Sequence, residues 1–328
     1  MPYRRPSPRI SSKLALGDPR WSELTASWRD GAKEVPLLLK RIARERDFSS
    51  KARSSAWGRL LEIIYHRRTG YTSTFAAFPY LVELAIEHPA GPSVDLWIDL
   101  GHIAATHRDP RHPIPPFLSA AFQQAIRAAE PRCLDVLLGE ALRADRAAHL
   151  AVASIAFSGH PVGGLLATEL LEPEPEAECH CPECQGQFLL ALLEDGLATY
   201  RSFNGRFPTT ADPSQPRTGA PFECTGPPRS SPWEQVADRL GSARLPRGFA
   251  TEWRAELTAA ASQARRGLEG ANARCALAVL GALLALKGHP AVASKLLRLT
   301  GRLRCPHCGS IRDVADALEL FRVGSGGS

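Results

Sequence analysis

The sequence predicts an all-α protein in which pairs of helices stack side by side as an α-solenoid. Apolar residues recur at spacings of three and four over most of the chain, as on the buried stripe of a helix. Breaks that contain Pro or Gly separate these segments after roughly 12 to 18 residues, and almost no stretch alternates with the period of two that a strand needs. A helix pair cannot bury its apolar stripe alone, so stacking on neighbouring pairs is expected.

The predicted helices follow one another along the chain. The first begins at Pro19, with Asp18 as its N-cap, because Pro is favoured at the first helical position and Asp accepts a backbone hydrogen bond there. Pro131 is expected to separate two of the later helices. These later helices cover residues 50–68, 74–88, 95–107, 116–129, 131–143 and 145–157.

The predicted organisation has five parts. Residues 1–17, rich in Pro, Ser and Arg, form a mobile basic tail. Residues 18–200 form a helical array that ends with a first Cys-Pro-x-Cys sequence, and residues 233–323 form a helical repeat with a second one. Residues 201–232 contain seven prolines and are expected to be an exposed loop. Residues 324–328, Gly-Ser-Gly-Gly-Ser, look like an appended linker.

The net charge of +6 and pI near 9.0 hide an uneven distribution of charge. Residues 1–70 carry 16 basic and 7 acidic side chains, residues 71–200 carry 6 and 17, and residues 201–328 carry 18 and 10. An overall cation would indicate nucleic acid. The alternation fits equally well an elongated protein whose ends and middle meet different partner surfaces.

No secretory signal or membrane span is evident. The basic start leads into no apolar run, and the longest clean apolar stretch, Cys275–Leu286, is far shorter than the roughly 20 residues that cross a bilayer. We therefore expect a soluble, cytoplasmic protein. In that compartment the eight cysteines are not expected to form disulfides.

A repeated pattern links the middle of the chain to its C-terminal part. The segments 151–161 and 280–290 are each an apolar helix that stops at Gly-His-Pro, with His160 and His289 in equivalent positions. Gly suits the residue after a helix, His the negative end of the helix dipole, and Pro the start of the next helix. A short apolar helix and a Cys-Pro-x-Cys sequence follow each copy. The pattern predicts a duplicated helix–helix–knuckle unit.

The first knuckle (Cys181 and Cys184) and the second knuckle (Cys305 and Cys308) are the strongest chemical signal in the chain. Two thiolates on one tight turn can face a single ion, and Gly309 relaxes the second turn. Four thiolates complete a closed tetrahedral zinc site with no position for substrate. The knuckles are too far apart in sequence for a usual zinc ribbon, so they share an ion only if the fold brings them together. The duplicated unit favours this, and we predict one structural zinc ion on these four residues.

Three alternatives stay open for the knuckles. Cys179 and His180 could join Cys181 and Cys184 in a local mixed site. The two pairs could be thioredoxin-like redox motifs, although no βαβ pattern surrounds them. They could also be plain turns with free thiols.

No catalytic constellation is evident. His107-Arg108-Asp109 spells a kinase triplet, but no Gly-rich loop, strand lysine or Asp-Phe-Gly sequence accompanies it. The chain also lacks a Gly-x-Ser-x-Gly elbow, a phosphate-binding loop and a His-Glu-x-x-His helix. Cys133 and Cys275 lie on apolar stripes and are expected in the core. The sequence therefore favours a protein that is not an enzyme.

Residues 18–88 carry a further pattern, which comprises Trp21-Ser22-Glu23-Leu24, Val35-Pro36-Leu37-Leu38, Tyr65-His66, Thr69, Tyr71 and Pro79-Tyr80-Leu81-Val82. This pattern resembles the N-terminal block of uncharacterised bacterial HEAT-repeat proteins, many of which also carry Cys-Pro-x-Cys knuckles. The resemblance implies a HEAT-like α-solenoid. Some members of that group look like candidate immunity or defence-associated proteins, so the resemblance implies a role of that kind.

The turn of that pattern is a candidate partner contact. It brings Tyr65, His66, Arg67, Arg68 and Tyr71 to one helix end, and Tyr and Arg are enriched at binding hot spots. The two arginines stand where the resembling proteins usually have Gln-Gly. A structural alternative, which we favour, places Tyr65 in the core, leaves the arginines in water and packs Tyr71 against the next helix.

The function that we expect is a non-enzymatic protein-binding α-solenoid, such as an immunity protein that binds a cognate toxin. Stacked helix pairs present long concave faces that suit a protein partner. An acidic middle could face a basic partner through Glu83, Glu87, Asp95, Asp99 and Asp109.

The alternative is a nucleic-acid-binding protein that uses its basic N-terminal third. Four cations follow each other closely there, namely Lys40, Arg41, Arg44 and Arg46. Phosphate contacts would make such binding fall steeply with salt. A run of this kind is more often a solvated helix face, so this alternative ranks second. No membrane partner is expected.

Overall fold

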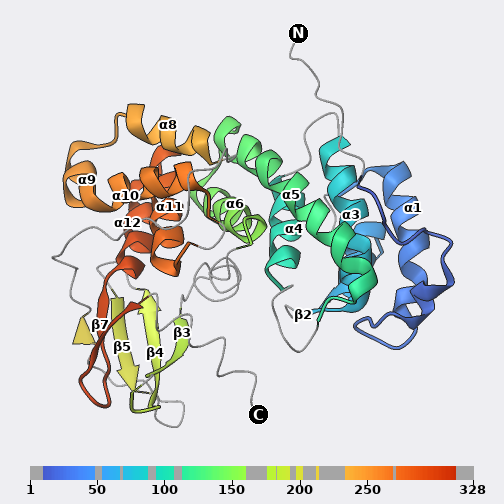
Figure 1. Ribbon diagram of the computed structural model, residues 1–328, viewed down its shortest axis with the longest axis horizontal. Helices are drawn as coiled ribbons and strands as arrows, with labels where there is room; N and C mark the ends of the chain where they lie inside the picture. The colour runs from blue at the N-terminus through green and yellow to red at the C-terminus, as the bar shows by residue number, and fades with distance from the viewer. Residues whose placement is uncertain are drawn as a thin grey trace. The chain divides into compact units, whose positions relative to one another are not determined.

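The computed structural model describes residues 10–48, 54–66, 69–87, 94–106, 113–159, 176–181, 183–192, 197–201, 212–213, 233–268 and 271–314. Helices dominate these residues, which confirms the predicted helical character, and a smaller number of residues form antiparallel strands (Figure 1). The chain divides into two compact units, here called the N-terminal unit (Met1–Gly139) and the C-terminal unit (Glu140–Ser328). The boundary falls inside the segment 18–200 for which the sequence predicted one array.

The N-terminal unit is built from helices around one short hairpin. Its helical elements are η1 (Pro19–Glu23), η2 (Gly31–Glu34), α1 (Val35–Glu45), α2 (Ala56–Ile64), α3 (Thr72–Glu87), α4 (Val94–Thr106) and α5 (Pro116–Gly139). Between α2 and α3, β1 (Tyr65–His66) pairs with β2 (Thr69–Gly70) in antiparallel register. As predicted, the Asp18 carboxylate caps η1 by accepting a hydrogen bond from the Arg20 backbone N–H at 2.9 Å.

Helix α3 lies at the centre of the N-terminal unit and contacts α1, α2, α4 and α5. Its Phe75 and Phe78 pack against Phe122 of α5, with ring centroids 5.2 Å and 4.8 Å apart. These rings and the indoles of Trp57 and Trp97 are almost completely buried. Large aromatic side chains therefore supply much of the apolar burial that stabilises this unit.

In the described part of the chain, Pro131 and Pro79 lie inside helices. Helix α5 continues through Pro131, so the predicted break at that residue is wrong. Proline inside a helix costs about 3 kcal/mol or more, because it removes a backbone donor and crowds the preceding turn. Burial of Cys133, Leu134 and Leu137 on the following turns offsets this cost. Pro79 is likewise buried within α3.

The N-terminal segment (residues 10–17) packs on α3, although the sequence suggested a tail there. Ile10 and Leu14 are buried. The Ile10 backbone N–H donates to Glu83 Oε1 at 2.7 Å, and the Tyr80 hydroxyl donates to the Leu14 carbonyl, also at 2.7 Å. The residues that precede this segment lie outside the described part of the chain.

The C-terminal unit packs its helices around α11. These helical elements are α6 (Ala144–Phe157), α8 (Glu234–Ser242), α9 (Arg247–Glu252), α10 (Arg254–Arg266), α11 (Ala273–Leu286), α12 (Pro290–Leu297) and η4 (Arg298–Thr300). Every residue of α11 up to Ala285 is buried, and the helix contacts α6, α8, α10 and α12. The Asn272 side chain caps α11 by accepting from the Cys275 N–H at 2.8 Å.

The helix-stop pattern behaves as predicted where the structure describes it. Gly288 follows α11 with a φ of 80°, and Pro290 starts α12. In the first copy, Gly159 follows α6 with a φ of 79°. His160 and Pro161 lie outside the described residues. Because α6 and α11 hold equivalent places in the two copies and contact each other, the described part is consistent with a duplication.

A four-stranded antiparallel sheet occupies a stretch for which the sequence predicted helices and a loop. Its strands, in spatial order, are β3 (Glu176–His180), β4 (Gln187–Leu192), β5 (Leu197–Arg201) and β6 (Asp212–Pro213). A separate hairpin joins β7 (Arg302–Arg304) to β8 (Ile311–Asp313). In β4, Phe188 and Leu190 are buried while Leu189 is half-buried, but all three are apolar, and this hides the period of two.

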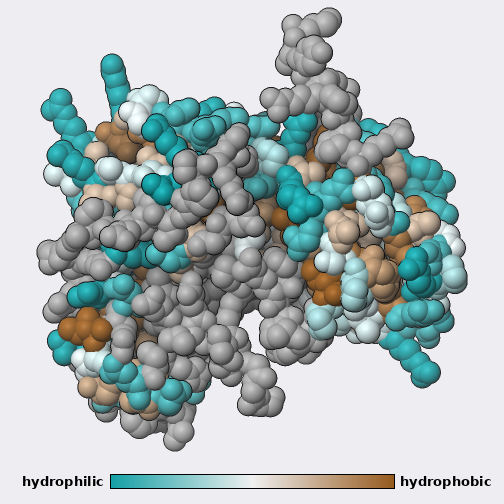
Figure 2. Space-filling view, viewed as in Figure 1, coloured by the Kyte–Doolittle hydropathy of each residue, from teal (hydrophilic) through white to brown (hydrophobic). Residues whose placement is uncertain are grey.

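The visible surface of the described residues is mainly hydrophilic, with apolar side chains in small groups (Figure 2). Among these residues, the large apolar side chains that are clearly exposed are Leu37, Phe117 and Ile311. No helix in the described part of the chain is both long and apolar enough to cross a membrane.

Candidate metal centre

The first knuckle is a tight turn between β3 and β4. The Cys181 backbone N–H donates to the Gly186 carbonyl at 3.0 Å, and the Gln185 N–H donates to the Cys181 carbonyl at 2.9 Å. These two bonds close the turn and direct both cysteine side chains to one side. Gln185 has a φ of 57°, a left-handed backbone conformation that residues other than Gly rarely adopt.

The second knuckle repeats this turn between β7 and β8. Its Cys305 N–H donates to the Ser310 carbonyl at 2.8 Å, and the Gly309 N–H donates to the Cys305 carbonyl at 2.9 Å. Gly309 has a φ of 75° and occupies the place that Gln185 holds in the first knuckle. The prediction that Gly309 relaxes its turn is thus confirmed, and the same backbone geometry recurs in both copies.

The fold brings the two knuckles together. Cys181 Sγ lies 3.7 Å from Cys308 Sγ, and Cys184 Sγ lies 3.8 Å from Cys305 Sγ. All four sulfur atoms lie within 4.8 Å of one another. The predicted juxtaposition of segments that are far apart in the chain is therefore present.

The four sulfur atoms fit a tetrahedral metal ion. A metal–sulfur bond of about 2.3 Å places the corners of a tetrahedron about 3.8 Å apart, which matches the sulfur–sulfur distances of 3.7 Å and 3.8 Å between the knuckles. Each knuckle contributes one buried thiol, Cys181 or Cys305, and one exposed thiol, Cys184 or Cys308. The cluster can hold one metal ion with every ligand supplied by the protein.

The surroundings shift the pKa values of the cluster's thiols in different directions. Burial raises the pKa of Cys305 to about 12. Burial also acts to raise the pKa of Cys181, but hydrogen bonds from the Cys184 backbone N–H and the Ser310 hydroxyl outweigh it, and the pKa falls to about 7. A hydrogen bond from the Ser310 hydroxyl, 3.2 Å away, lowers the pKa of Cys308. Metal binding requires thiolates, so a bound cation would displace the remaining thiol protons.

A contact that involves no cysteine also joins the knuckles. The imidazole of His307, from the second knuckle, donates from Nε2 to the Gln187 carbonyl at 2.7 Å. Its ring covers Gly186, where an added Cβ would lie only 2.7 Å from His307 Cδ2. Sequence reasoning missed this contact, although a Gly beside the first knuckle and a His within the second were visible.

The other predicted site residues are not part of this cluster. The side chains of Cys179 and His180, which the local mixed site would need, lie outside the described residues. Tyr65, His66 and Tyr71 are each half-buried at the β1–β2 hairpin. Arg67 and Arg68, which complete the candidate contact, are not described.

Two further cysteines behave as expected. Cys133 and Cys275 are completely buried in helices, away from the knuckles in sequence. Comparison of the chain with protein-family models, with curated proteins and with solved structures finds no match in any of the three. Function is therefore inferred from the site and the fold, and the resemblance to HEAT-repeat proteins stays a prediction.

Proposed function

We propose that the protein is a non-enzymatic protein-binding α-solenoid of the HEAT-like type, stabilised by one structural zinc ion. The observation that carries the proposal is the cluster of four sulfur atoms within 4.8 Å of one another on two distant segments. Thiolate ligands in a tetrahedron favour zinc over hard cations such as Mg²⁺ and Ca²⁺, which take oxygen ligands.

The ligand set supports a structural role and not a catalytic one. Catalytic zinc sites keep one coordination position for water or substrate, whereas structural sites are closed by four protein ligands. Here four cysteines fill the tetrahedron, and two of them are buried. Zinc at this site would supply no activated water, so its contribution is to folding free energy.

A shared ion would act as a cross-link between the two knuckles. Cys184 and Cys305 are 121 residues apart. By the chain-entropy relation used for disulfides, closing a loop of that length removes unfolded-state entropy worth about 4 to 5 kcal/mol. This is a large part of the stability of a typical domain, which is about 5 to 15 kcal/mol.

The partner that we propose is a protein, with a cognate toxin as the specific case. Helix pairs in series offer extended surfaces, and Tyr65 and Tyr71 are only half-buried. The acidic patch that we predicted is smaller in the folded unit, because Glu83 is paired internally with Lys13. Glu87 remains exposed.

Two experiments test the proposal, the first on the structural zinc site and the second on the protein partner. The protein is loaded with Co²⁺, whose spectrum reports its ligands, and is then exposed to azide and imidazole. Closed four-thiolate coordination predicts intense thiolate charge-transfer bands that neither ligand changes. Bands that shift with azide would indicate an open position and would contradict the structural role.

For the partner, the protein is co-expressed with the product of the adjacent gene in its genome. The proposal predicts rescue of growth from a toxic product and co-purification in a fixed ratio. Failure of both, together with retention on duplex DNA that weakens steeply with salt, would instead support the nucleic-acid alternative.

A further inference from the structure

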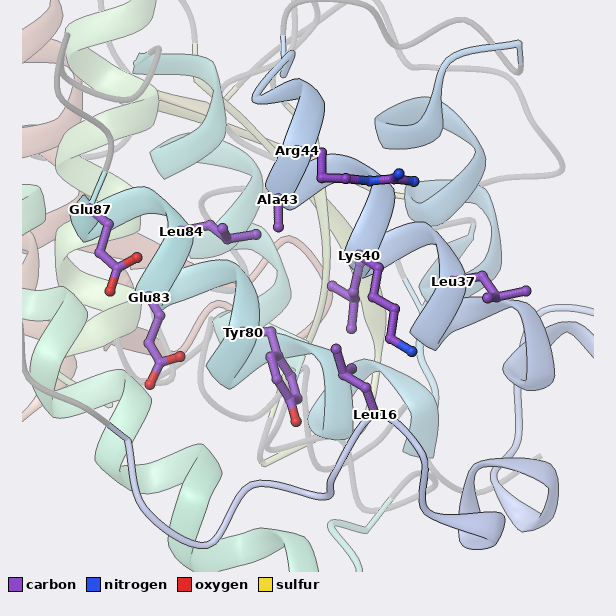
Figure 3. Close-up of a pocket in the computed structure, with 10 residues that line it drawn as sticks. Leu16, Leu37, Lys40, Ala43, Arg44, Tyr80, Glu83, Leu84 and Glu87 are labelled. Carbon is purple, nitrogen blue, oxygen red and sulfur yellow. The ribbon is translucent and has the colours of Figure 1, made fainter.

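A cavity lies between α1 and α3 in the N-terminal unit (Figure 3). Its volume is about 600 Å³, and we call it the α1–α3 groove. Its apolar lining comprises Leu16, Leu37, Leu39, Ala43, Tyr80 and Leu84. Leu37 is 68% exposed, which is unusual for a leucine and leaves apolar surface in water at the rim.

The α3 side of the groove is largely neutralised by the protein itself. Glu83 forms an ion pair with Lys13 and accepts a hydrogen bond from the Ile10 N–H. Lys13 also lies 4.6 Å above the centroid of the Tyr80 ring, a cation–π distance. Glu83 therefore offers little free charge to a ligand. Glu87, one turn further along α3, keeps an exposed carboxylate.

The α1 side of the groove carries two cations. Lys40 and Arg44 are exposed lining residues, and neither forms an ion pair with another described residue. Arg41 on the same helix differs, since it pairs with Glu45 at 2.6 Å. Lys40 and Arg44 are four residues apart, so their like charges are neighbours on the helix surface. An anion bound beside Lys40 would relieve that repulsion.

The two sides together select the class of ligand. Figure 3 shows the Lys40 ammonium near Leu16 and the Glu87 carboxylate on the opposite side of the groove. We propose that the α1–α3 groove binds a small amphiphilic anion, with its apolar body on the leucines and its anionic head on Lys40. Arg44, whose guanidinium Figure 3 shows directed away from Leu84, adds positive charge at the rim. The free carboxylate of Glu87 repels the head and so fixes the orientation of the ligand.

The size of the groove favours a small molecule over a partner helix. Small-molecule sites usually have volumes of roughly 300 to 1,000 Å³ and a mostly apolar lining with few polar groups. On α1 the lining runs from Leu37 to Arg44, a rise of about 10 Å, which suits a medium-chain acyl or two-ring aromatic body. Leu37 is the one clearly exposed large apolar residue of α1, too few for the stripe that anchors a docked helix. This ligand site is independent of the zinc site, and it shares only Glu87 with the acidic surface proposed for the protein partner.

The test uses the full chain and two defined probes. Anilinonaphthalene sulfonate, an aromatic anion, is bound first and is then displaced by decanoate or by the uncharged analogue decanol. The proposal predicts that decanoate displaces the dye at a concentration at least tenfold lower than decanol does. Equal potency of the two competitors would overturn the assigned role of the cations.

Variants locate the site. The double variant Lys40→Glu/Arg44→Glu should weaken decanoate binding at least tenfold and leave the affinity for decanol unchanged. Arg41→Glu, the matched control on the same helix, should change the affinity for neither competitor. Ala43→Trp, an exposed position, should block both competitors by filling the groove. A photoreactive decanoate analogue should label peptides of α1 or α3, which does not depend on any variant. Labelling elsewhere, or equal affinity for all variants, would refute the proposal.

Discussion

The contact between Gly186 and His307 allows the meeting of the two knuckles to be tested without altering a cysteine. Gly186 has no positive φ, so the backbone accepts Ala there at no conformational cost. The added Cβ would instead meet the His307 ring, at 2.7 Å from Cδ2 and 2.8 Å from Cγ. Any loss of stability in Gly186→Ala therefore reports the approach of the second knuckle to the first.

The size of that loss follows from what the ring must give up. His307 is exposed and can rotate away, but it then loses its 2.7 Å hydrogen bond to the Gln187 carbonyl, worth about 1 kcal/mol. Residual overpacking adds about 1 kcal/mol or more. We expect a destabilisation of about 2 kcal/mol, which corresponds to a fall in Tm of about 4 to 8 °C for a unit of this size.

The assay is a double-mutant cycle by urea unfolding of zinc-loaded protein. In the His307→Ala background the ring is gone and only the Cβ of residue 307 stays close, at 3.1 Å. Gly186→Ala should then cost less than about 1 kcal/mol, and the coupling should exceed about 1 kcal/mol. Gly241→Ala in α8 is the matched control, because nothing lies within 4 Å of its added Cβ. It should be neutral or stabilising. An equal cost of Gly186→Ala in both backgrounds would refute the inferred contact.

Three other predictions follow from the described geometry. Gly309→Ala should lower the free energy of unfolding in urea by about 1 kcal/mol. The cost of placing Ala in a left-handed conformation, about 1 to 2 kcal/mol, exceeds the gain from a stiffer unfolded chain. Gln185→Gly, at the equivalent place in the first knuckle, should not destabilise the protein. Glu83→Gln removes the ion pair that holds the N-terminal segment on α3, so trypsin should cleave after Lys13 severalfold faster than in the wild type. An unchanged cleavage rate would contradict the packing of that segment. Metal release, followed with a metallochromic dye, should increase as pH falls, because protons compete with the metal for the thiolates. Cys305, with a pKa of about 12, binds its proton most tightly. Release that increases with pH would argue against thiolate ligands.

The features that could be predicted from sequence are those set by residues close together in the chain. The N-cap at Asp18, the glycines that follow α6 and α11 and the turn at Gly309 all depend on local backbone rules. The four cysteines of the cluster were also found in this way, because a Cys-Pro-x-Cys spacing defines its own turn.

The features that could not be predicted depend on contacts between distant residues. The buried apolar residues of β4 hide the strand period, and tertiary burial keeps α5 helical through Pro131. Ile10 and Leu14 are isolated apolar residues in a polar sequence, so only their contact with α3 reveals that they are buried. In the site itself, the packing of His307 on Gly186 joins two segments that no local pattern connects.

The most direct test of one structural zinc ion shared by the two knuckles is the zinc content per chain, measured by elemental mass spectrometry on protein purified without added chelator. The wild type and a Cys133→Ser/Cys275→Ser control, which removes two thiols outside the cluster, should each contain one zinc per chain. A Cys305→Ser/Cys308→Ser variant should contain none and should unfold at a lower temperature. Zinc that persists in this variant, or wild-type protein that is stable without any metal, would contradict a single structural site shared by the two knuckles.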